Sequence, residues 1–352
     1  MVSLDQLQCQ CSRFSLKGVS VPLYRLGSNS GLDDGSVAEE QSLLDSVLLA
    51  HWEDRMWKGL FRYDVTASEI KVIGGRRKFI AQFNERWSAD CVPKPGRSKI
   101  GRGVFELWMD CQEELLFSVA RGAESSPELV LAADVPDSAL LITVNVSAIE
   151  YGHVFLIPYC SNILYQFLDA KSLELALRVA VEVKNYSFRL FYDFSPGASH
   201  IYFQACYFQS PLPVEFMPSD TLFIDGQKKM CISSVVDYPI KTLVFESNHF
   251  EPMLEVVAEI CSCLQGKLIL YNLLVSDNGR KIFLFLQQHT SKTSFTLSAW
   301  ECGGYFLFKS RSAYDQATEM TLLKQLSTVS IDKEGFEAVK LMCRSIASKF
   351  TS

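Results

Sequence analysis

The sequence predicts an α+β protein with an antiparallel sheet, flanking helices and two halves of related design packed as one unit. Three observations support this class. Short strand-like segments follow one another closely, helical periodicity appears at wide intervals between them, and part of this order recurs after a proline-rich loop. The chain has 352 residues, enough for two domains or one large one.

The first 41 residues show little periodicity, and the run 27-GSNSGLDDGS-36 has the composition of a loop. We therefore expect a flexible arm over residues 1–41. A first half is expected over residues 42–210, and a second α+β half over residues 211–352.

Within the first half, a helix is predicted over residues 42–59, where apolar residues recur at helical spacing and Gly59 stands at the end. A second helix is predicted over 168–184 for the same reason, and Pro93 and Pro95 indicate a long loop over 86–103. Strands are predicted at 61–65, 69–73, 78–83, 115–119, 140–146, 153–158, 189–194 and 200–208.

Three prolines, Pro211, Pro213 and Pro218, mark the boundary between the halves because proline does not fit the middle of a sheet. A hairpin turned on 277-DNG-279 is predicted beyond them. The other elements predicted in this half are strands at 242–246 and 304–309 and helices at 253–265, 313–327 and 334–349.

Charge and hydropathy exclude several classes of protein. The chain has 34 Lys and Arg against 40 Asp and Glu, a formal net charge of −6, which argues against binding nucleic acid. Its richest apolar segment, 139–159, is interrupted by Asn145, Glu150 and His153, so no membrane span is expected. The first residues lack the basic and apolar regions of a signal peptide, which favours a cytoplasmic location.

Eleven cysteines are spread over the whole chain, and an odd, scattered set does not suggest a disulfide framework. The pairs Cys9/Cys11 and Cys261/Cys263 have no second Cys or His pair at zinc-site spacing. We therefore expect reduced structural thiols, no metal and no cofactor.

The segment 200-HIYFQACYF-208 is the most informative one for function. In a strand, His200, Tyr202 and Gln204 would share one face with Cys206, and the opposite face would be almost wholly apolar. Such a polar stripe fits the wall of a binding site, and it equally fits a solvent-exposed sheet face.

Several blocks of the chain, in order, resemble one family. They are HWEDRMWKGLFRYDVTASEIKVI (51–73), KFIAQFNE (78–85), QEELLF (112–117), VNVSAIEYGHVFLIP (144–158), DAKSLELAL (169–177), HIYFQACY (200–207), YPIKTLVFE (238–246), SDNGRKIFLF (276–285) and GFEAVKLMC (335–343). The resemblance is to the GDP-L-galactose and GDP-D-glucose phosphorylases, in the galactose-1-phosphate uridylyltransferase branch of the histidine-triad superfamily. It implies a histidine-triad-like fold.

The resemblance also implies a two-step reaction. A histidine attacks the α-phosphorus of a GDP-hexose and carries GMP, and hexose 1-phosphate leaves. Inorganic phosphate then takes the GMP, which gives GDP. In plants, the L-galactose version implies a link to ascorbate synthesis.

The family's site strand has the pattern His-x-His-x-Gln, whose second His is the nucleophile. Here His200 matches the first His and Gln204 the Gln, but Tyr202 stands at the nucleophile position. A phenol with a pKa near 10 is a poor nucleophile at neutral pH. Displaced attack by His200 would require the nucleotide to shift by about 6.5–7 Å, two residues along a strand.

Other implied site positions differ as well. The resemblance puts Asn145, His153 and Asp193 near the nucleotide. His153 matches the family's Gly-His turn, where a histidine more often packs and bonds to the backbone. Asp193 lies in a shortened loop, and it would bring negative charge to a phosphate site if it pointed inward. Ala148 replaces a proline of the family, and Tyr159 replaces an arginine that could pair with phosphate.

We therefore expect a phosphorylase-like protein that is catalytically weak or inactive, with guanine-nucleotide binding or a regulatory role retained. The alternative is an active GDP-hexose phosphorylase that uses His200. The expected partners are a GDP-hexose or guanine nucleotide and inorganic phosphate, with a homodimer or a complex with an active relative also open. Nucleic acid and membrane are not expected partners.

Overall fold

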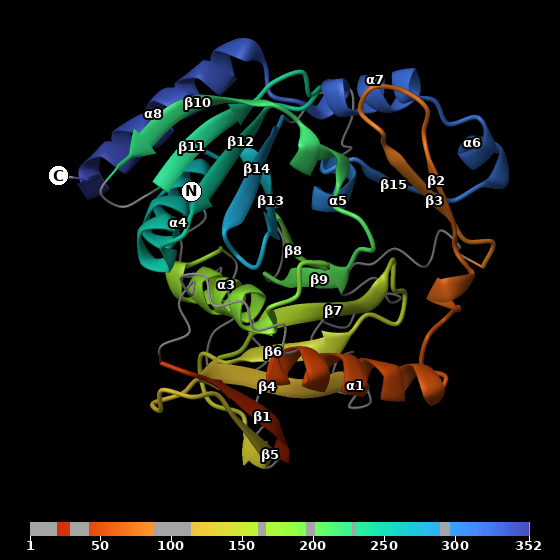
Figure 1. Cartoon of the computed structure of the whole chain (residues 1–352), viewed down its shortest axis with the longest axis vertical. Helices are drawn as coiled ribbons and strands as arrows, with labels where there is room; N and C mark the ends of the chain where they lie inside the picture. The colour runs from red at the N-terminus through yellow and green to blue at the C-terminus, as the bar shows by residue number, and fades with distance from the viewer. Residues whose placement is uncertain are drawn as a thin grey trace, which may run out of the picture.

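Two sheets and seven α-helices make up the part of the chain described by the structure, a computed structural model. It describes residues 20–28, 42–86, 114–160, 167–194, 201–226, 230–288 and 296–351. A 12-stranded sheet runs through the molecule and a three-stranded sheet lies beside it (Figure 1). The α+β class predicted from the sequence is confirmed.

The large sheet has the order β10-β11-β12-β14-β13-β8-β9-β7-β6-β4-β1-β5, and its neighbouring strands are antiparallel except for β1 with β4. From the first half come β1 (Ser20–Leu26), β4 (Leu115–Arg121), β5 (Glu128–Asp134), β6 (Leu140–Val144), β7 (Tyr151–Pro158), β8 (Phe188–Asp193) and β9 (Phe203–Tyr207). From the second come β10 (Ser219–Asp225), β11 (Met230–Val235), β12 (Thr242–Ser247), β13 (Leu270–Ser276) and β14 (Lys281–Gln287).

The small sheet has the order β15-β3-β2 and joins distant parts of the chain. Its strands are β2 (Glu69–Val72), β3 (Ile80–Phe83) and β15 (Tyr305–Phe308). The helices are α1 (Leu43–Trp57), α3 (Ala170–Val183), α4 (Phe250–Gly266), α5 (Ala299–Cys302), α6 (Arg311–Asp315), α7 (Glu319–Val329) and α8 (Lys333–Thr351), with 3₁₀ turns η2 (Val65–Ala67) and η4 (Pro213–Phe216).

The two halves share one topology. In the first, β6, β7, α3, β8 and β9 follow in sequence, and their strands lie in the order β8-β9-β7-β6. In the second, β11, β12, α4, β13 and β14 give the order β13-β14-β12-β11. β8 and β13 pair at the centre, so the halves form one continuous sheet across the predicted boundary near residue 210.

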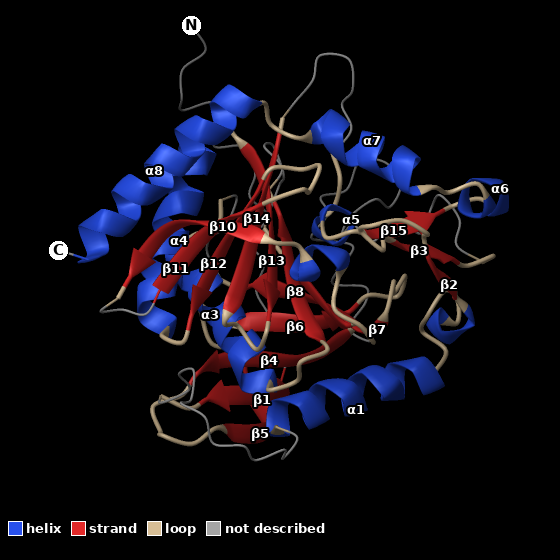
Figure 2. Ribbon diagram, turned by 45° about the horizontal axis from the view of Figure 1, so that its top comes forward, coloured by secondary structure: helices blue, strands red, loops and turns tan. Residues whose placement is uncertain are grey.

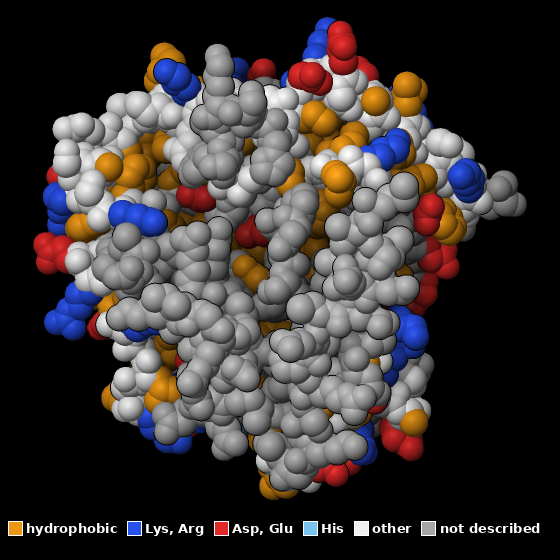
Figure 3. Space-filling view, turned by 180° about the vertical axis from the view of Figure 1, so that it is seen from behind, with side chains coloured by type: hydrophobic (Ala, Val, Ile, Leu, Met, Phe, Trp, Pro, Cys, Tyr) orange, Lys and Arg blue, Asp and Glu red, His pale blue; other side chains and the backbone are white. Residues whose placement is uncertain are grey.

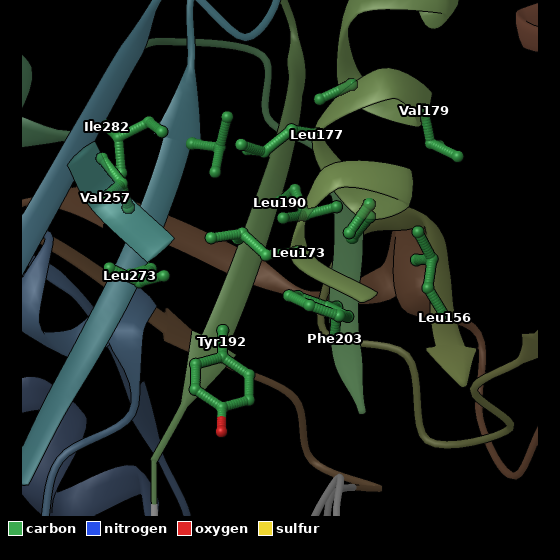
Figure 4. Close-up of a cluster of buried hydrophobic side chains, with 14 of the residues drawn as sticks. Leu156, Leu173, Leu177, Val179, Leu190, Tyr192, Phe203, Val257, Leu273 and Ile282 are labelled. Carbon is green, nitrogen blue, oxygen red and sulfur yellow. The ribbon is translucent and has the colours of Figure 1, made fainter. Parts of the chain in front are cut away.

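One face of the large sheet is covered by α1, α3, α4 and α8 (Figure 2). Leu173 and Leu177 of α3 pack toward Leu190 and Phe203 of the sheet (Figure 4). The helix forms here because Asp169 caps its first turn by accepting from the backbone N–H groups of Lys171 and Ser172.

The opposite face is covered by the small sheet and by α5 and α7. A second buried cluster there joins residues of both halves, among them Phe191, Cys206, Phe285 and Trp300. Around the rim seen in Figure 3, side chains of both charges are interspersed.

The predicted hairpin is confirmed. Asp277, Asn278 and Gly279 all have positive φ, at 52°, 49° and 81°. Residues of the Asn and Gly types adopt this left-handed backbone most readily, which is why the turn signal was reliable.

The prediction of an arm over residues 1–41 is wrong for Ser20–Leu26. These residues form β1, which lies between β4 and β5. Tyr24 is fully buried, and its hydroxyl donates to Glu182 at 2.9 Å. Partners about 100 residues away stabilise this strand, so local periodicity did not reveal it. Residues 1–19 and 29–41 lie outside the described residues.

Other corrections concern element boundaries. The predicted strand 61–65 is an irregular segment, since Asp64 caps the 3₁₀ turn that follows it. The predicted helix 313–327 is two helices, α6 and α7, because Thr318 caps a new start. Strands β5, β10 and β11 were not predicted. Most of the loop predicted at 86–103 lies outside the described residues.

The described residues hold neither a membrane-spanning helix nor a group of side chains suited to a metal ion. No helix there has the length and apolar character needed to cross a bilayer. No group of three or more His, Cys, Asp or Glu side chains there could hold a metal ion. The cysteines in these segments are free thiols, and Cys261 is buried within α4.

A buried ion pair gives a first prediction. Arg189 of β8 is 3% exposed, and its guanidinium donates to both carboxylate oxygens of Glu215, at 2.8 and 3.0 Å. Glu215→Gln leaves this charge buried without its partner, so we expect the free energy of unfolding in urea to fall by about 3 kcal/mol.

The exposed pair of Arg311 and Glu69 provides the control, because solvent screens it. Glu69→Gln should leave the urea midpoint nearly unchanged. Equal effects of the two substitutions would contradict the role assigned to Arg189 and Glu215.

Candidate functional site

The candidate site lies on the sheet face opposite α1, α3, α4 and α8. Along β9, Phe203, Ala205 and Tyr207 pack into the helical-face core, as does Ile201 just before the strand. Tyr202, Gln204 and Cys206 lie on the other face, as the alternation predicts. This second face is not exposed to solvent, because Gln204 is 3% exposed and Cys206 is fully buried. The alternative of a solvent-exposed sheet face is therefore excluded for these two residues.

His153 is the centre of a buried hydrogen-bonded cluster. Its Nδ1 accepts from the backbone N–H of Ile149 at 3.1 Å, so its ring proton lies on Nε2. That N–H donates to Oε1 of Gln204 at 3.2 Å. The one accepting nitrogen and the one N–H of the neutral imidazole are thereby both used, and the bond to Nε2 orients the Gln204 amide.

Two further residues hold this histidine. The side-chain amide of Asn145 lies 3.4 Å from each ring nitrogen, and its Oδ1 accepts from the N–H of Ser147 at 2.9 Å. The indole of Trp52 donates to the backbone carbonyl of His153 at 3.2 Å. Burial lowers the pKa of His153 to about 3, although the bond to Gln204 acts in the opposite direction. The imidazole is therefore neutral at physiological pH.

Tyr202 lies one residue before β9 and is partly buried. Its ring meets Phe155 edge to face at 5.6 Å. Burial raises the pKa of its hydroxyl, and the Asp193 carboxylate raises it further. The phenol at the predicted nucleophile position is thus held in its protonated form.

Asp193 ends β8 and connects the two halves. Its carboxylate accepts from the side-chain amide of Asn272 and from the backbone N–H of Ala299 at 2.8 Å. Asn272 also donates to the carbonyl of Leu297 at 3.0 Å, and Gln287 donates to the same carbonyl at 2.9 Å. Asp193 therefore anchors the start of α5 while its charge remains near Tyr202.

An apolar wall adjoins these polar groups. Leu141, Phe155, Ile157 and Tyr159 form a buried cluster on this face, and Tyr202 packs against it. Phe155 lies directly opposite Gln204 in the β7–β9 register. An amide is thus placed next to a surface suited to an aromatic or sugar ring.

The structure brings Asn145, His153 and Gln204 into one cluster and places Tyr202 and Asp193 beside it. His200 lies outside the described residues. Ala148 and Tyr159, the two other positions of departure, are both buried. Sequence reasoning missed the contribution of the second half, namely Asn272 and Trp300, because it depends on the pairing of β8 with β13. No local motif marks either residue.

Comparisons with known proteins cover most of the chain. Residues 43–206 match a family model described as "GDPGP1-like, N-terminal domain", and residues 213–350 match "GDPGP1-like, C-terminal domain".

Two similar relatives have established names. GDP-L-galactose phosphorylase 1 of Arabidopsis thaliana is 34% identical, over 92% of this chain and 80% of that protein. GDP-D-glucose phosphorylase 1 of Homo sapiens is 27% identical, over 63% of this chain and 57% of that protein.

Among solved structures, yeast Ap4A phosphorylase Apa2 matches with a TM-score of 0.56 at 13% identity, over 82% of this chain and 98% of that one. At this identity the match shows the fold alone. It agrees with the predicted histidine-triad-like architecture.

The buried His153 predicts a pH dependence of stability. Its pKa is about 3 in the folded protein and about 6.5 in the unfolded chain, so only the unfolded state takes up a proton between these values. The neutral, buried His153 therefore contributes fully to the free energy of unfolding above pH 6.5, and this contribution is lost as the pH falls toward 3. The loss approaches about 1.4 kcal/mol per pH unit.

Urea unfolding of the wild type and of His153→Asn between pH 7 and pH 4.5 checks this. We expect the variant to be less stable at pH 7 and the two curves to converge on acidification. Parallel curves would show that His153 is not the buried neutral group described.

Proposed function

Because this chain belongs to the GDPGP1-like family, in which its named relatives are GDP-hexose phosphorylases, we propose that it binds a guanine nucleotide or GDP-hexose but transfers GMP poorly or not at all. The observation that carries the proposal is Tyr202, a protonated phenol at the position where the family has its nucleophilic histidine.

Retained binding is supported by the hydrogen bonds around Gln204. Its amide keeps its orientation through His153, and its Oε1 is used as an acceptor, which leaves the NH₂ group for a ligand oxygen. The adjoining wall of Leu141, Phe155 and Ile157 suits the apolar faces of a base and ribose. The net charge of −6 does not oppose this, since local donors decide the binding of a single nucleotide.

Weak transfer is supported by two features of the same face. The family reaction forms a bond from a histidine nitrogen to the α-phosphorus, expels hexose 1-phosphate, and then returns GMP to inorganic phosphate. A neutral tyrosine hydroxyl is a weak nucleophile, and burial and the nearby Asp193 carboxylate both raise its pKa, which keeps it protonated. The Asp193 carboxylate would also repel the entering phosphate groups.

The resulting role is that of a nucleotide-responsive partner or regulator. It follows from binding without turnover in a chain that keeps the family's scaffold. We propose a cytoplasmic setting for it, and a homodimer or a complex with a catalytically competent relative as its assembly.

The first test is release of GDP from GDP-L-galactose or GDP-D-glucose in the presence of inorganic phosphate. We expect the wild type to show little or no turnover. Tyr202→His restores the imidazole, and Tyr202→His combined with Asp193→Asn also removes the nearby charge. Turnover of the double variant should exceed that of the wild type by at least about a hundred-fold.

Robust wild-type turnover that His200→Ala abolishes would contradict the proposal and support the alternative nucleophile. Binding is measured separately by calorimetry with GDP, where Tyr207→Phe is the control. Tyr207 lies on the same strand but faces the helices, and its hydroxyl donates to Asp45 at 2.7 Å. This variant should lose stability without losing affinity, whereas Gln204→Met should lose affinity.

A further inference from the structure

The indole N–H of Trp300 is buried and donates to no described residue. Trp300 lies in α5 and is 4% exposed, and its indole Nε1 has no hydrogen-bond partner among the residues that the structure describes. Leaving an indole N–H unpaired away from water is costly, and such groups are uncommon in folded proteins. Such a donor is available to an acceptor that the described residues do not supply.

Trp300 lies next to the candidate site. Its ring meets His153 edge to face at 6.3 Å and Phe191 edge to face at 5.8 Å. Phe191 lies directly opposite Gln204 in the β8–β9 register, and His153 donates to Gln204. The indole of the second half is therefore adjacent to the amide of the first.

α5 is held firmly enough to present this side chain. Asp193 accepts from the N–H of Ala299, and Gln287 forms two bonds with the backbone of Leu297, at 2.9 and 3.0 Å. Ser298 and Glu301 close a capping box around the first turn. The orientation of Trp300 is thus fixed by polar contacts to β8 and β14.

A second unsatisfied atom lies on the same face. Thr143 of β6 is 2% exposed and lies directly opposite Phe155, and its Oγ1 has no hydrogen-bond partner in the described segments of the chain. Two buried polar atoms without partners among the described residues therefore lie near the His153 and Gln204 cluster, one on helix α5 and one on strand β6. Buried polar atoms without a partner are uncommon in folded proteins, so two of them near one cluster call for an explanation.

We propose that the Trp300 indole N–H donates a hydrogen bond to a phosphate oxygen of the bound guanine nucleotide. The inference rests on the proposed function of nucleotide binding. Phosphate is the acceptor class because the neighbouring polar group is the Gln204 amide, while the apolar wall that suits a base is formed by Leu141, Phe155 and Ile157. A bond to an ionised phosphate is also stronger than one to a neutral group.

Calorimetry with GDP and with guanosine tests the inference in the full chain. Trp300→Phe keeps an aromatic ring in place but removes the donor. We expect its Kd for GDP to rise about ten-fold, as for the loss of one hydrogen bond to a charged group, while the Kd for guanosine stays the same. The ratio of the two Kd values is the readout, because general loosening of the site would weaken both.

Two variants serve as controls. Phe245→Leu removes comparable volume from the core on the helical face, so it should lower the Tm without changing the ratio. Ser276→Ala removes another buried unpartnered polar atom, at the end of β13, and should change neither Kd.

The outcomes separate the two proposals. If the wild type binds no guanine nucleotide, both the proposed function and this inference fail. If the wild type and Trp300→Phe bind GDP equally, only the inference fails, and an ordered water is the partner of the indole. An equal loss of affinity for GDP and guanosine overturns the assignment to phosphate.

Discussion

The pairing of β8 with β13 is the interaction on which the rest of the architecture depends. It joins two five-element units of the same topology into one sheet, with Asn272 opposite Asp193 and Leu274 opposite Phe191. Because β9 is the next strand after β8, the candidate site lies only one strand from this junction. Elements of the second half, α5 above all, can therefore reach a site whose sequence motif belongs entirely to the first.

Polar groups on the site face fall into two classes. His153, Asn145 and Gln204 form bonds that satisfy one another and the backbone, so their geometry is fixed before any ligand binds. Trp300 and Thr143 keep unsatisfied atoms in the same region. The first class preserves the shape of the site. The unpaired atoms of Trp300 and Thr143 lower the stability of the folded protein, and a hydrogen bond to a ligand would offset this loss.

The sequence predicted those features that local patterns determine. Alternation along residues 201–207 correctly assigned the two faces of β9, periodicity located α3, and 277-DNG-279 identified the hairpin. It did not predict β1, whose burial depends on strands far along the chain.

The candidate site was predictable only in part, for the same reason. Gln204 and Tyr202 were identified by a strand motif, and the resemblance pointed to Asn145, His153 and Asp193. The contact of Trp300 with His153 joins residues 147 positions apart in sequence (300 minus 153) and depends on the folded sheet. No period or motif encodes such a contact, because it is specified by packing.

The shared topology of the halves also bears on what the fold requires of the site strand. In the second half, the strand that corresponds to β9 is β14, whose matching face carries Phe283 and Phe285 in a stacked pair within an apolar core. The unit in the second half thus folds with apolar side chains at these positions of its corresponding strand, so the fold of the unit needs no catalytic side chain there. The fold of the unit therefore does not depend on which side chains its site strand carries on this face.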